Sequence, residues 1–315
     1  MKILIIRLSS IGDIVLATPL VRCLRKKFPS AQIDFLVKKK YSEILSANPY
    51  ISNLIFFENS IFELARRIKK ERYDLILDIH SNFRTFLLTL FSGAKILRYK
   101  NYLIERFFLV EFGLNFYKEK VPVFQRYLKT VESLGVLYDD KGLDFFIDPA
   151  LGGSKNQYVG ICPVAVWKTK RWPKENFVNL AKKILEKNNC KILIFGGEKD
   201  FDYCEDIKKQ VGDRAKNLCG SSLQETAVAL RECKCLLTND TGIMHIAEAL
   251  SVPTVAIFGP TAEEFGFYPQ TEQSKIISKK FLCKPCSTKG SNKCPVGDSR
   301  CMNDISVEEV YPALS

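Results

Sequence analysis

The chain has 315 residues, of which 46% are hydrophobic and 26% charged, and a net charge of +12. This length allows two globular domains, and no apolar run reaches the roughly 18 residues that a membrane-spanning helix needs. Arg7 interrupts the first apolar run after four residues. We therefore expect a first strand in place of a secretory signal, and a cytoplasmic protein.

The positive charge lies mainly in the first half. Residues 1–150 contain 24 Lys and Arg against 16 Asp and Glu, which is a net charge of +8. Such an excess suits an anionic membrane surface, a nucleic acid or a phosphorylated substrate. Charge alone does not choose between them.

Strand-like apolar runs alternate with amphipathic helical runs in both halves. In the first half we expect strands at 2–7, 33–37, 53–57, 73–79 and 95–99, and helices at 14–28, 41–47, 60–71, 82–91 and 122–135. In the second half we expect strands at 158–163, 191–197, 234–238 and 254–259, and helices at 174–188, 200–211, 223–231 and 243–250. This alternation is typical of parallel α/β layers.

A stretch rich in Pro, Gly and Ser, "DPALGGSKNQ", separates the two halves. It indicates a linker. We predict an α/β fold with two Rossmann-like, doubly wound domains, 1–150 and 151–315. Because ligands of such sheets bind beyond the carboxyl ends of the strands, we expect the two domains to face each other across a cleft.

The first strand ends in "RLSSIGDIV", which contains neither a dinucleotide fingerprint nor a P-loop. Ser9, Ser10 and Gly12 form the turn, and Asp13 is expected to begin the next helix. Two interpretations of Asp13 stay open from the residues alone. It could cap the helix, since Asp accepts the free N–H groups there, or it could act as a general base at the edge of a cleft.

Two loops in the second half suggest a phosphate site. "CPVAVWKTKRWPKENF" places Lys168, Lys170 and Arg171 directly after a strand, and the alternative is a solvated basic turn. "TNDTGIMHIAEAL" ends a strand at 240–242 and starts a helix that carries His245 in its first turn. The free N–H groups and positive dipole of a helix N-terminus bind phosphate well. The alternatives are a capping aspartate and a structural histidine.

Three stretches together carry a resemblance: "KILIIRLSSIGDIVLATPLVRCLRKKFP", "KRWPKENF" and "LTNDTGIMHIAEALSVPTVAIFGPT". In this order and at these separations they resemble glycosyltransferase family 9, the ADP-heptose:lipopolysaccharide heptosyltransferases. The resemblance covers essentially the whole chain. It implies a GT-B fold with the acceptor on the N-terminal domain and the nucleotide sugar on the C-terminal domain. It also implies an inverting, metal-independent transfer with no cofactor.

The resemblance also implies roles for single residues. Asp13 matches the catalytic base of the family, and Lys170 matches the lysine that contacts the phosphate of the donor. The donor site would be formed by Asp240, Thr241, Gly242 and His245, with Glu198 near the ribose and Ser221 or Ser222 near the adenine. Acceptor binding is assigned to Ser10, Gly12 and Arg84. The segment "VAVWK" lacks the Thr-rich phosphate loop of some members, so Ala165 and Val166 would contribute only backbone contacts.

The implied partners are ADP-heptose and the inner core of lipopolysaccharide, either Kdo-lipid A or its heptosylated form. The sequence does not fix which heptose is added. Segment 98–120 interleaves cations with Tyr and Phe, which suits either peripheral contact with the anionic inner membrane or a partly buried loop-helix segment of the acceptor domain. No nucleic acid is expected. The alternatives are a GT-B enzyme that uses another nucleotide sugar and a non-catalytic nucleotide-binding protein that docks on an anionic membrane.

Four of the eleven cysteines lie together near the C-terminus: Cys283, Cys286, Cys294 and Cys301. Thiolates at this spacing could bind zinc or an iron–sulfur cluster. The loops between them are short for a zinc ribbon. We therefore favour reduced or locally paired cysteines and assign no metal site.

Overall fold

The computed structural model describes residues 1–57, 60–152 and 158–314, which fold into two compact units. The first unit comprises Met1–Tyr102 and Val121–Phe146, and the second comprises Leu103–Lys120 and Ile147–Ser315. The second unit therefore includes a segment, Leu103–Lys120, that lies before residue 150 in the chain.

The first unit is built on a five-stranded parallel sheet in the order β3-β2-β1-β4-β5. Its strands are β1 (Lys2–Ile6), β2 (Gln32–Lys38), β3 (Asn53–Phe57), β4 (Leu75–Asp78) and β5 (Lys95–Arg98). Apolar runs such as residues 3–6 are fully buried, because helices cover both faces of a parallel sheet. From β1 the chain adds β2 and β3 on one side of the sheet, and then β4 and β5 on the other side. The topological switch point, where the strand order reverses and ligands of such sheets bind, therefore lies between β1 and β4.

The helices of the first unit pack in pairs, α2 (Thr18–Lys27) against α6 (Val123–Lys129) and α3 (Ile61–Glu71) against α4 (Phe83–Thr89). The helix expected at 14–28 is wrong in one respect, because it is two helices, α1 (Ile11–Val15) and α2. Pro19 lies in the first turn of α2, where its missing N–H costs no helical hydrogen bond. The helix expected at 41–47 is a 3₁₀ helix, η1 (Lys39–Ile44).

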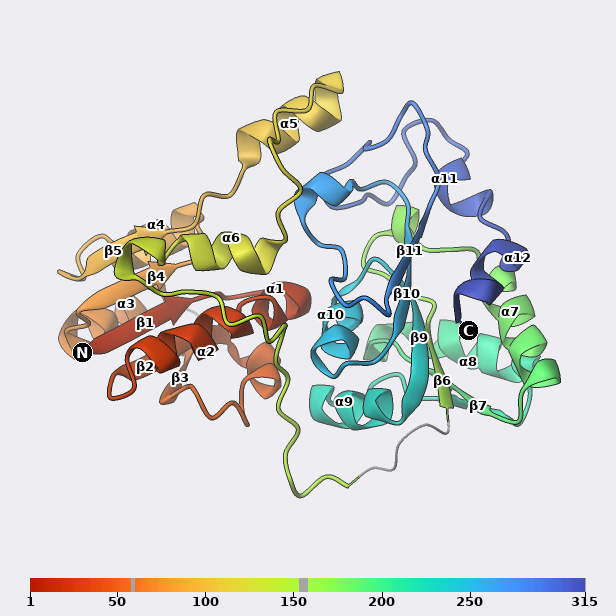
Figure 1. The fold of residues 1–315 in the computed structure, drawn as a ribbon, viewed down its shortest axis with the longest axis horizontal. Coiled ribbons are helices and arrows are strands. Elements are labelled where there is room, and N and C mark those ends of the chain that lie inside the picture. The colour runs from red at the N-terminus through yellow and green to blue at the C-terminus, as the bar shows by residue number, and fades with distance from the viewer. Residues whose placement is uncertain (58–59, 153–157, 315) are drawn as a thin grey trace. The chain divides into compact units, whose positions relative to one another are not determined.

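The second unit contains a six-stranded parallel sheet in the order β11-β10-β9-β6-β7-β8. Its strands are β6 (Tyr158–Cys162), β7 (Lys191–Ile194), β8 (Ala215–Asn217), β9 (Cys233–Asn239), β10 (Thr254–Phe258) and β11 (Lys275–Ser278). Figure 1 shows α9 (Leu223–Arg231) and α10 (Gly242–Ala249) on one face, and α7 (Lys174–Lys187) and α8 (Phe201–Val211) on the other. This is the Rossmann strand order, with the switch point between β6 and β9.

Three features of the second unit were missing from the sequence expectations. The edge strands β8 and β11 have three and four residues, and β8 ("AKN") has no apolar run that would indicate a strand. Helix α5 (Leu103–Phe112) packs with the second unit, because Arg106 lies over the rings of Phe265 and Phe267, 5.7 Å from each.

The short elements that complete the two units are η2 (Glu132–Leu134), η3 (Lys168–Lys170), η4 (Glu198–Asp200), η5 (Glu263–Phe265), α11 (Arg300–Asn303), α12 (Val307–Val310) and η6 (Tyr311–Leu314).

The two parallel sheets with covering helices confirm the predicted α/β fold of two Rossmann-like units. Within the described residues, no helix combines the length and the apolar character needed to cross a membrane.

Candidate functional site

The first cluster of site residues lies at the switch point of the first unit, around Asp13. Helix α1 begins at Ile11, so Ser10 is the N-cap and Asp13 is the third helical residue. The backbone N and the Oγ of Ser10 both donate to Asp13 Oδ2, at 3.1 and 2.8 Å. Asp13 therefore does not begin the helix as expected. It is the acidic member of a capping box, which satisfies the backbone N–H of Ser10.

Arg7, the first residue after β1, holds the other oxygen of this carboxylate. Its Nη2 lies 2.5 Å from Asp13 Oδ1, and the two side chains are 12% and 15% exposed. Arg7 Nη1 donates to the carbonyl oxygen of Ile79, at the end of β4, at 2.8 Å. Burial alone would raise the pKa of Asp13, but the charge of Arg7 and the hydrogen bonds from Arg7 and Ser10 bring it below its usual value. Asp13 is consequently an ionised carboxylate with a fixed orientation.

His80 belongs to the same cluster, although sequence reasoning did not single it out. Burial, followed by the positive charge of Arg7, lowers the pKa of His80 to about 4, so the imidazole is neutral at ordinary pH. Among the described residues its buried Nδ1 has no hydrogen-bond partner. The sequence feature that could have identified His80 is its position directly after the apolar run 73–79, at the carboxyl end of a predicted strand.

The three residues assigned to acceptor binding lie at the same edge of the first sheet. Ser10 and Gly12 flank Asp13 in the turn and in α1. Arg84 is an exposed residue in the first turn of α4, and its charge contributes to the lowered pKa of His80. The structure therefore places Ser10, Gly12 and Arg84 around the ends of β1 and β4, in the neighbourhood of Asp13 and His80.

The second cluster lies at the switch point of the second unit. Lys170, at the end of η3, forms an ion pair with Asp240, which follows β9, with 2.6 Å between Nζ and Oδ2. Thr261 Oγ1 donates to the same Oδ2 at 2.9 Å. The side chains of Lys170 and Asp240 are only 13% and 10% exposed. The basic loop and the Asp-Thr-Gly stretch, which are 70 residues apart in the sequence, thus meet at one point.

The loop that carries Lys170 is anchored by Trp172. This side chain is fully buried, and its indole Nε1 donates to the carbonyl oxygen of Ile305 at 2.9 Å. Its backbone N donates to Asn239 Oδ1 at 2.9 Å, and the amide of Asn239 donates to the carbonyl oxygen of Cys162 at 3.4 Å. The alternative of a freely solvated basic turn is therefore wrong for this loop.

Thr241 is the N-cap of α10, and Gly242 is its first residue. His245 lies in the same helix, is 3% exposed and places Nδ1 3.4 Å from Glu248 Oε2. Glu248 in turn accepts a hydrogen bond from the backbone N of Gln270 at 2.7 Å. The imidazole is therefore held in one orientation from its own helix.

Glu198 and Ser221 follow the neighbouring strands β7 and β8. Glu198 begins η4, and the next loop approaches it closely at Gly220, where an added Cβ would lie 3.8 Å from Glu198 Cα. Ser222 accepts a hydrogen bond from the backbone N of Glu225 and so caps α9. Ser221 is half-buried beside it. The structure brings Glu198 and Ser221 together at the carboxyl edge that also carries Lys170 and Asp240.

The four C-terminal cysteines are free thiols, one exposed and three half-buried. Burial raises the pKa of Cys301 to about 11, with a further contribution from Cys286. Over the part of the chain that the structure describes, no three Cys, His, Asp or Glu side chains are arranged to hold a metal ion.

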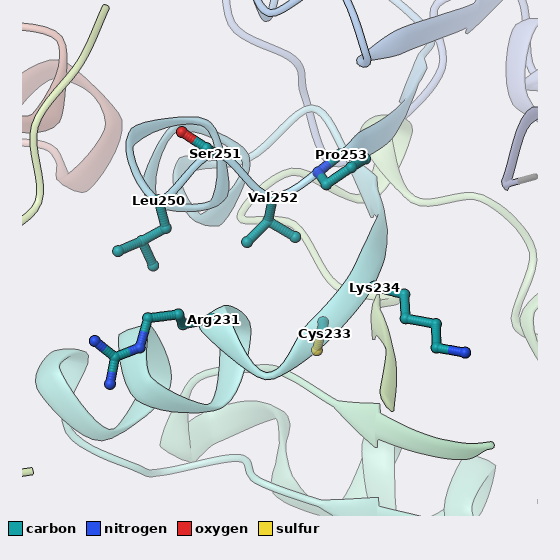
Figure 2. A pocket seen from close by; sticks show the side chains of 7 residues that line it. All are labelled: Arg231, Cys233, Lys234, Leu250, Ser251, Val252 and Pro253. Carbon is teal, nitrogen blue, oxygen red and sulfur yellow. The ribbon is translucent and has the colours of Figure 1, made fainter. Parts of the chain in front are cut away.

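A pocket of about 420 Å³ lies at the opposite, amino-terminal edge of the second sheet (Figure 2). Its walls come from the end of α9, the start of β9 and the loop before β10. The lining residues are Arg231, Cys233, Lys234, Leu250, Ser251, Val252 and Pro253. None of the predicted site residues lines it, and ligands of parallel sheets bind at the other edge.

The chain is similar to known proteins of one family. The model of glycosyltransferase family 9 (heptosyltransferase) matches residues 61–296. Lipooligosaccharide heptosyltransferase 2 of Campylobacter jejuni is 29% identical, with 98% of this chain and 96% of the relative covered. Lipopolysaccharide heptosyltransferase 2 of Escherichia coli is 27% identical, with 88% of each covered.

The solved structure of the E. coli ADP-heptose lipopolysaccharide heptosyltransferase II superposes with a TM-score of 0.77 at 23% identity. It covers 100% of this chain and 97% of the other, which confirms the predicted GT-B fold. Since the family model spans well over half of the sequence, the chain belongs to glycosyltransferase family 9, the heptosyltransferase family, and is a glycosyltransferase.

Proposed function

We propose that this enzyme transfers a heptose from ADP-heptose to the inner core of lipopolysaccharide, with inversion at the anomeric carbon and without a metal ion. The similar curated proteins are named as heptosyltransferases 1 and 2 of lipopolysaccharide or lipooligosaccharide. The acceptor is Kdo-lipid A or its heptosylated form. We assign acceptor binding to the N-terminal domain, 1–150, and donor binding to the C-terminal domain, 151–315.

The observation that carries the proposal is the Lys170–Asp240 pair in front of α10. An ammonium group and the N-terminus of a helix lie at one switch point, and both favour a diphosphate. They supply the positive charge that a divalent metal supplies in other transferases. Glu198 and Ser221, which follow the strands β7 and β8, suit the ribose and the adenine of the same nucleotide.

Asp13 is the proposed general base. The acceptor hydroxyl oxygen attacks the anomeric carbon and forms the new C–O bond, while the bond from that carbon to the phosphate oxygen breaks. The electron pair leaves with ADP, where Lys170 and the N–H groups of α10 stabilise the developing charge. The hydroxyl proton passes to Asp13. Its lowered pKa keeps it ionised before the transfer, and the hydroxyl proton becomes acidic enough to pass to it as the C–O bond forms.

The test is a donor and acceptor screen in buffer that contains EDTA. ADP-heptose and UDP-sugars are each combined with Kdo-lipid A and with heptosylated Kdo-lipid A. Mass spectrometry follows the products, and NMR assigns the anomeric configuration of the new bond. A heptose added only from ADP-heptose, with inversion and in the presence of EDTA, is expected. Loss of transfer with EDTA, or transfer from a UDP-sugar alone, would contradict the proposal.

We also propose that the enzyme works as a peripheral protein on the cytoplasmic face of the inner membrane. The sequence suggested that segment 98–120 binds a membrane through its cations, but its side chains in the structure favour apolar contact. Two of its cations are occupied within the second unit, Arg106 by aromatic rings and Lys120 by Glu263 at 2.8 Å. In contrast, α5 and the loop after it expose large apolar side chains: Leu103, Ile104, Phe107, Phe112, Leu114 and Phe116. We therefore expect mainly apolar insertion and only a modest dependence on salt.

Vesicle binding tests this surface. Phe107→Ser removes one inserting ring, and burial of such a side chain contributes about 1.5–3 kcal/mol, so binding should fall roughly tenfold or more. Phe62→Ser is the matched control, because Phe62 is 79% exposed on α3, outside this segment. Equal loss in both variants, or no binding by the unmodified enzyme to vesicles containing anionic lipids, would contradict the assignment.

A further inference from the structure

The cysteine-rich segment 283–301 packs directly on the loop that carries Lys170. Three hydrogen bonds join Thr169 to Ser291: the backbone N of Thr169 to Ser291 O at 3.1 Å, Thr169 Oγ1 to the same oxygen at 2.9 Å, and Ser291 N to Thr169 Oγ1 at 2.9 Å. Gly290, with φ of +97°, approaches Trp167 so closely that an added Cβ would lie 2.8 Å from Trp167 Cβ. The segment thus forms one wall of the loop.

The same segment also contacts the end of β10. The backbone N of Cys286 donates to the carbonyl oxygen of Pro260 at 3.1 Å. At Gly259 an added Cβ would lie 2.5 Å from Met302 Sδ and 3.2 Å from the carbonyl oxygen of Thr169. The loop after β10, the loop of Lys170 and the C-terminal part of the chain therefore meet at Gly259.

Lys284 extends from this segment to the carboxyl end of β10. Its Nζ donates to the carbonyl oxygen of Phe258 at 3.5 Å and to Ser278 Oγ. The backbone N of Asp240 bonds to the preceding residue of β10, at Ile257 O, at 3.1 Å. Adjacent carbonyl groups of one strand end thus hold the Lys284 ammonium and the start of the Asp-Thr-Gly stretch.

Lys284 and Lys170 differ in their partners. Lys170 forms an ion pair with Asp240, with 2.6 Å between Nζ and Oδ2. Across the described parts of the chain, Lys284 forms no ion pair, and its partners are two neutral oxygens. Burial lowers its pKa, against the effect of Cys301, Glu263 and Asp240. Burying a cation that has no carboxylate in direct contact is costly, and an anionic ligand would offset that cost.

We propose that Lys284 is a second binding residue for the diphosphate of the nucleotide donor, and that segment 283–301 serves to place it there and to hold the loop of Lys170. The inference rests on the proposed use of an ADP-sugar. It assigns a role to the cysteine-rich segment that needs no metal chemistry.

Titration calorimetry in metal-free buffer tests the proposal with ADP, AMP and adenosine on the full chain. A hydrogen bond to a charged group has a free energy that corresponds to roughly tenfold or more in affinity. Lys284→Met should lower the affinity for ADP by about this factor and lower the affinity for AMP less. The affinity for adenosine should stay unchanged. Lys284→Arg keeps the charge and should restore most of the ADP affinity.

Lys293→Met is the matched control, because Lys293 is an exposed lysine of the same segment. It should bind ADP as the unmodified enzyme does. Unchanged ADP affinity in a folded Lys284→Met, together with weakened affinity in Lys170→Ala, would overturn this inference and leave the proposed function intact. Equal weakening of ADP and adenosine would also overturn it, since the effect would then not involve phosphate. No ADP binding by the unmodified enzyme would instead contradict the proposed function.

Discussion

Both units place one ion pair at the switch point of a parallel sheet, but the two pairs are built in opposite ways. In the first unit, Arg7 lies 2.5 Å from Asp13, and the hydrogen bonds from Ser10 also go to the carboxylate. In the second unit, Lys170 lies 2.6 Å from Asp240, which is itself held by Thr261.

Under the proposed function, this difference assigns the chemistry to the acidic partner in the first unit and to the basic partner in the second. The neighbours of Asp13 orient a carboxylate and keep it ionised. The neighbours of Lys170 orient a cation, because Asp240 and the loop anchored by Trp172 fix its position. In this proposal the same pairing of charges serves a base in one unit and an anion site in the other. Four substitutions test this comparison.

The largest effect is expected for Asp13→Asn. Asn can still accept from Ser10, so the turn should persist, but it cannot take the acceptor's proton. The transfer rate should fall by roughly 10² to 10⁴, with near-normal ADP affinity. Since Arg7 loses its partner, we also expect a lower melting temperature. Rate assays, calorimetry with ADP and thermal unfolding measure the three effects. Turnover within a few fold of the unmodified enzyme would reduce Asp13 to a structural member of its capping box.

Lys170→Ala should weaken nucleotide binding, and because it leaves Asp240 without its ion-pair partner, each protein is compared with its own ligand-free state. At 100 times the dissociation constant, ADP should stabilise the unmodified protein by about 2.7 kcal/mol. A tenfold weaker variant would gain about 1.4 kcal/mol at the same concentration. Thermal unfolding with and without ADP, in EDTA, measures this difference. Lys168→Ala is the control, because Lys168 is an exposed residue of the same loop. An equal shift in both variants would argue against a specific role of Lys170.

Arg7→Met should change the pH dependence. The folded pKa of Asp13 is lowered, so the pair adds stability above the usual carboxyl pKa and loses it as pH falls through the folded pKa. Without Arg7, burial would raise that pKa, so the acid limb of kcat/KM should move to higher pH. The stability difference between the two proteins should shrink toward low pH. Arg7→Lys keeps the charge and should lie between them. If Arg7→Met and the unmodified enzyme have the same acid limb of kcat/KM, Arg7 does not act through Asp13.

The smallest effect is expected for Thr169→Val. The substitution removes the hydroxyl that bonds Ser291 and leaves the backbone bond in place. ADP affinity should fall only a few fold, because the loop keeps the Trp172 anchor. Calorimetry measures the change, and Thr226→Val, at a half-buried threonine of α9, is the control. An unchanged affinity would show that segment 283–301 does not support the loop of Lys170.

Much of this architecture was predictable because buried parallel strands are apolar runs of fixed length. The runs at 2–7 and 234–238 located both switch points, and the polar residues that follow them located Asp13 and Asp240. The strands β8 and β11 were not predictable, since their short, half-exposed sequences carry no apolar pattern. Position in the chain also placed 103–120 in the first half, whereas packing against Phe265 and Phe267 groups it with the second unit.

The partners of the site residues were less accessible to prediction. In the sequence, Arg7 is visible only as an interruption of an apolar run. Its contact with Asp13 depends on the path of the turn between them and was not predictable. His80 is polar and follows a strand, which is a weak signal by itself. The spacing of the cysteines suggested a metal site and gave no indication of Lys284. The position of Lys284 depends on contacts with residues far away in the sequence.

The assignment of Leu103–Lys120 to the second unit means that the polypeptide passes between the units three times. A single break in the backbone after residue 150 would therefore not yield two self-sufficient pieces. The N-terminal piece would keep Leu103–Lys120, whose contacts include Lys120 with Glu263 at 2.8 Å and the Tyr268 hydroxyl with Lys120 O at 2.8 Å. In two fragments cut at this point, segment 103–120 would carry contacts that the second unit needs on the other piece of chain.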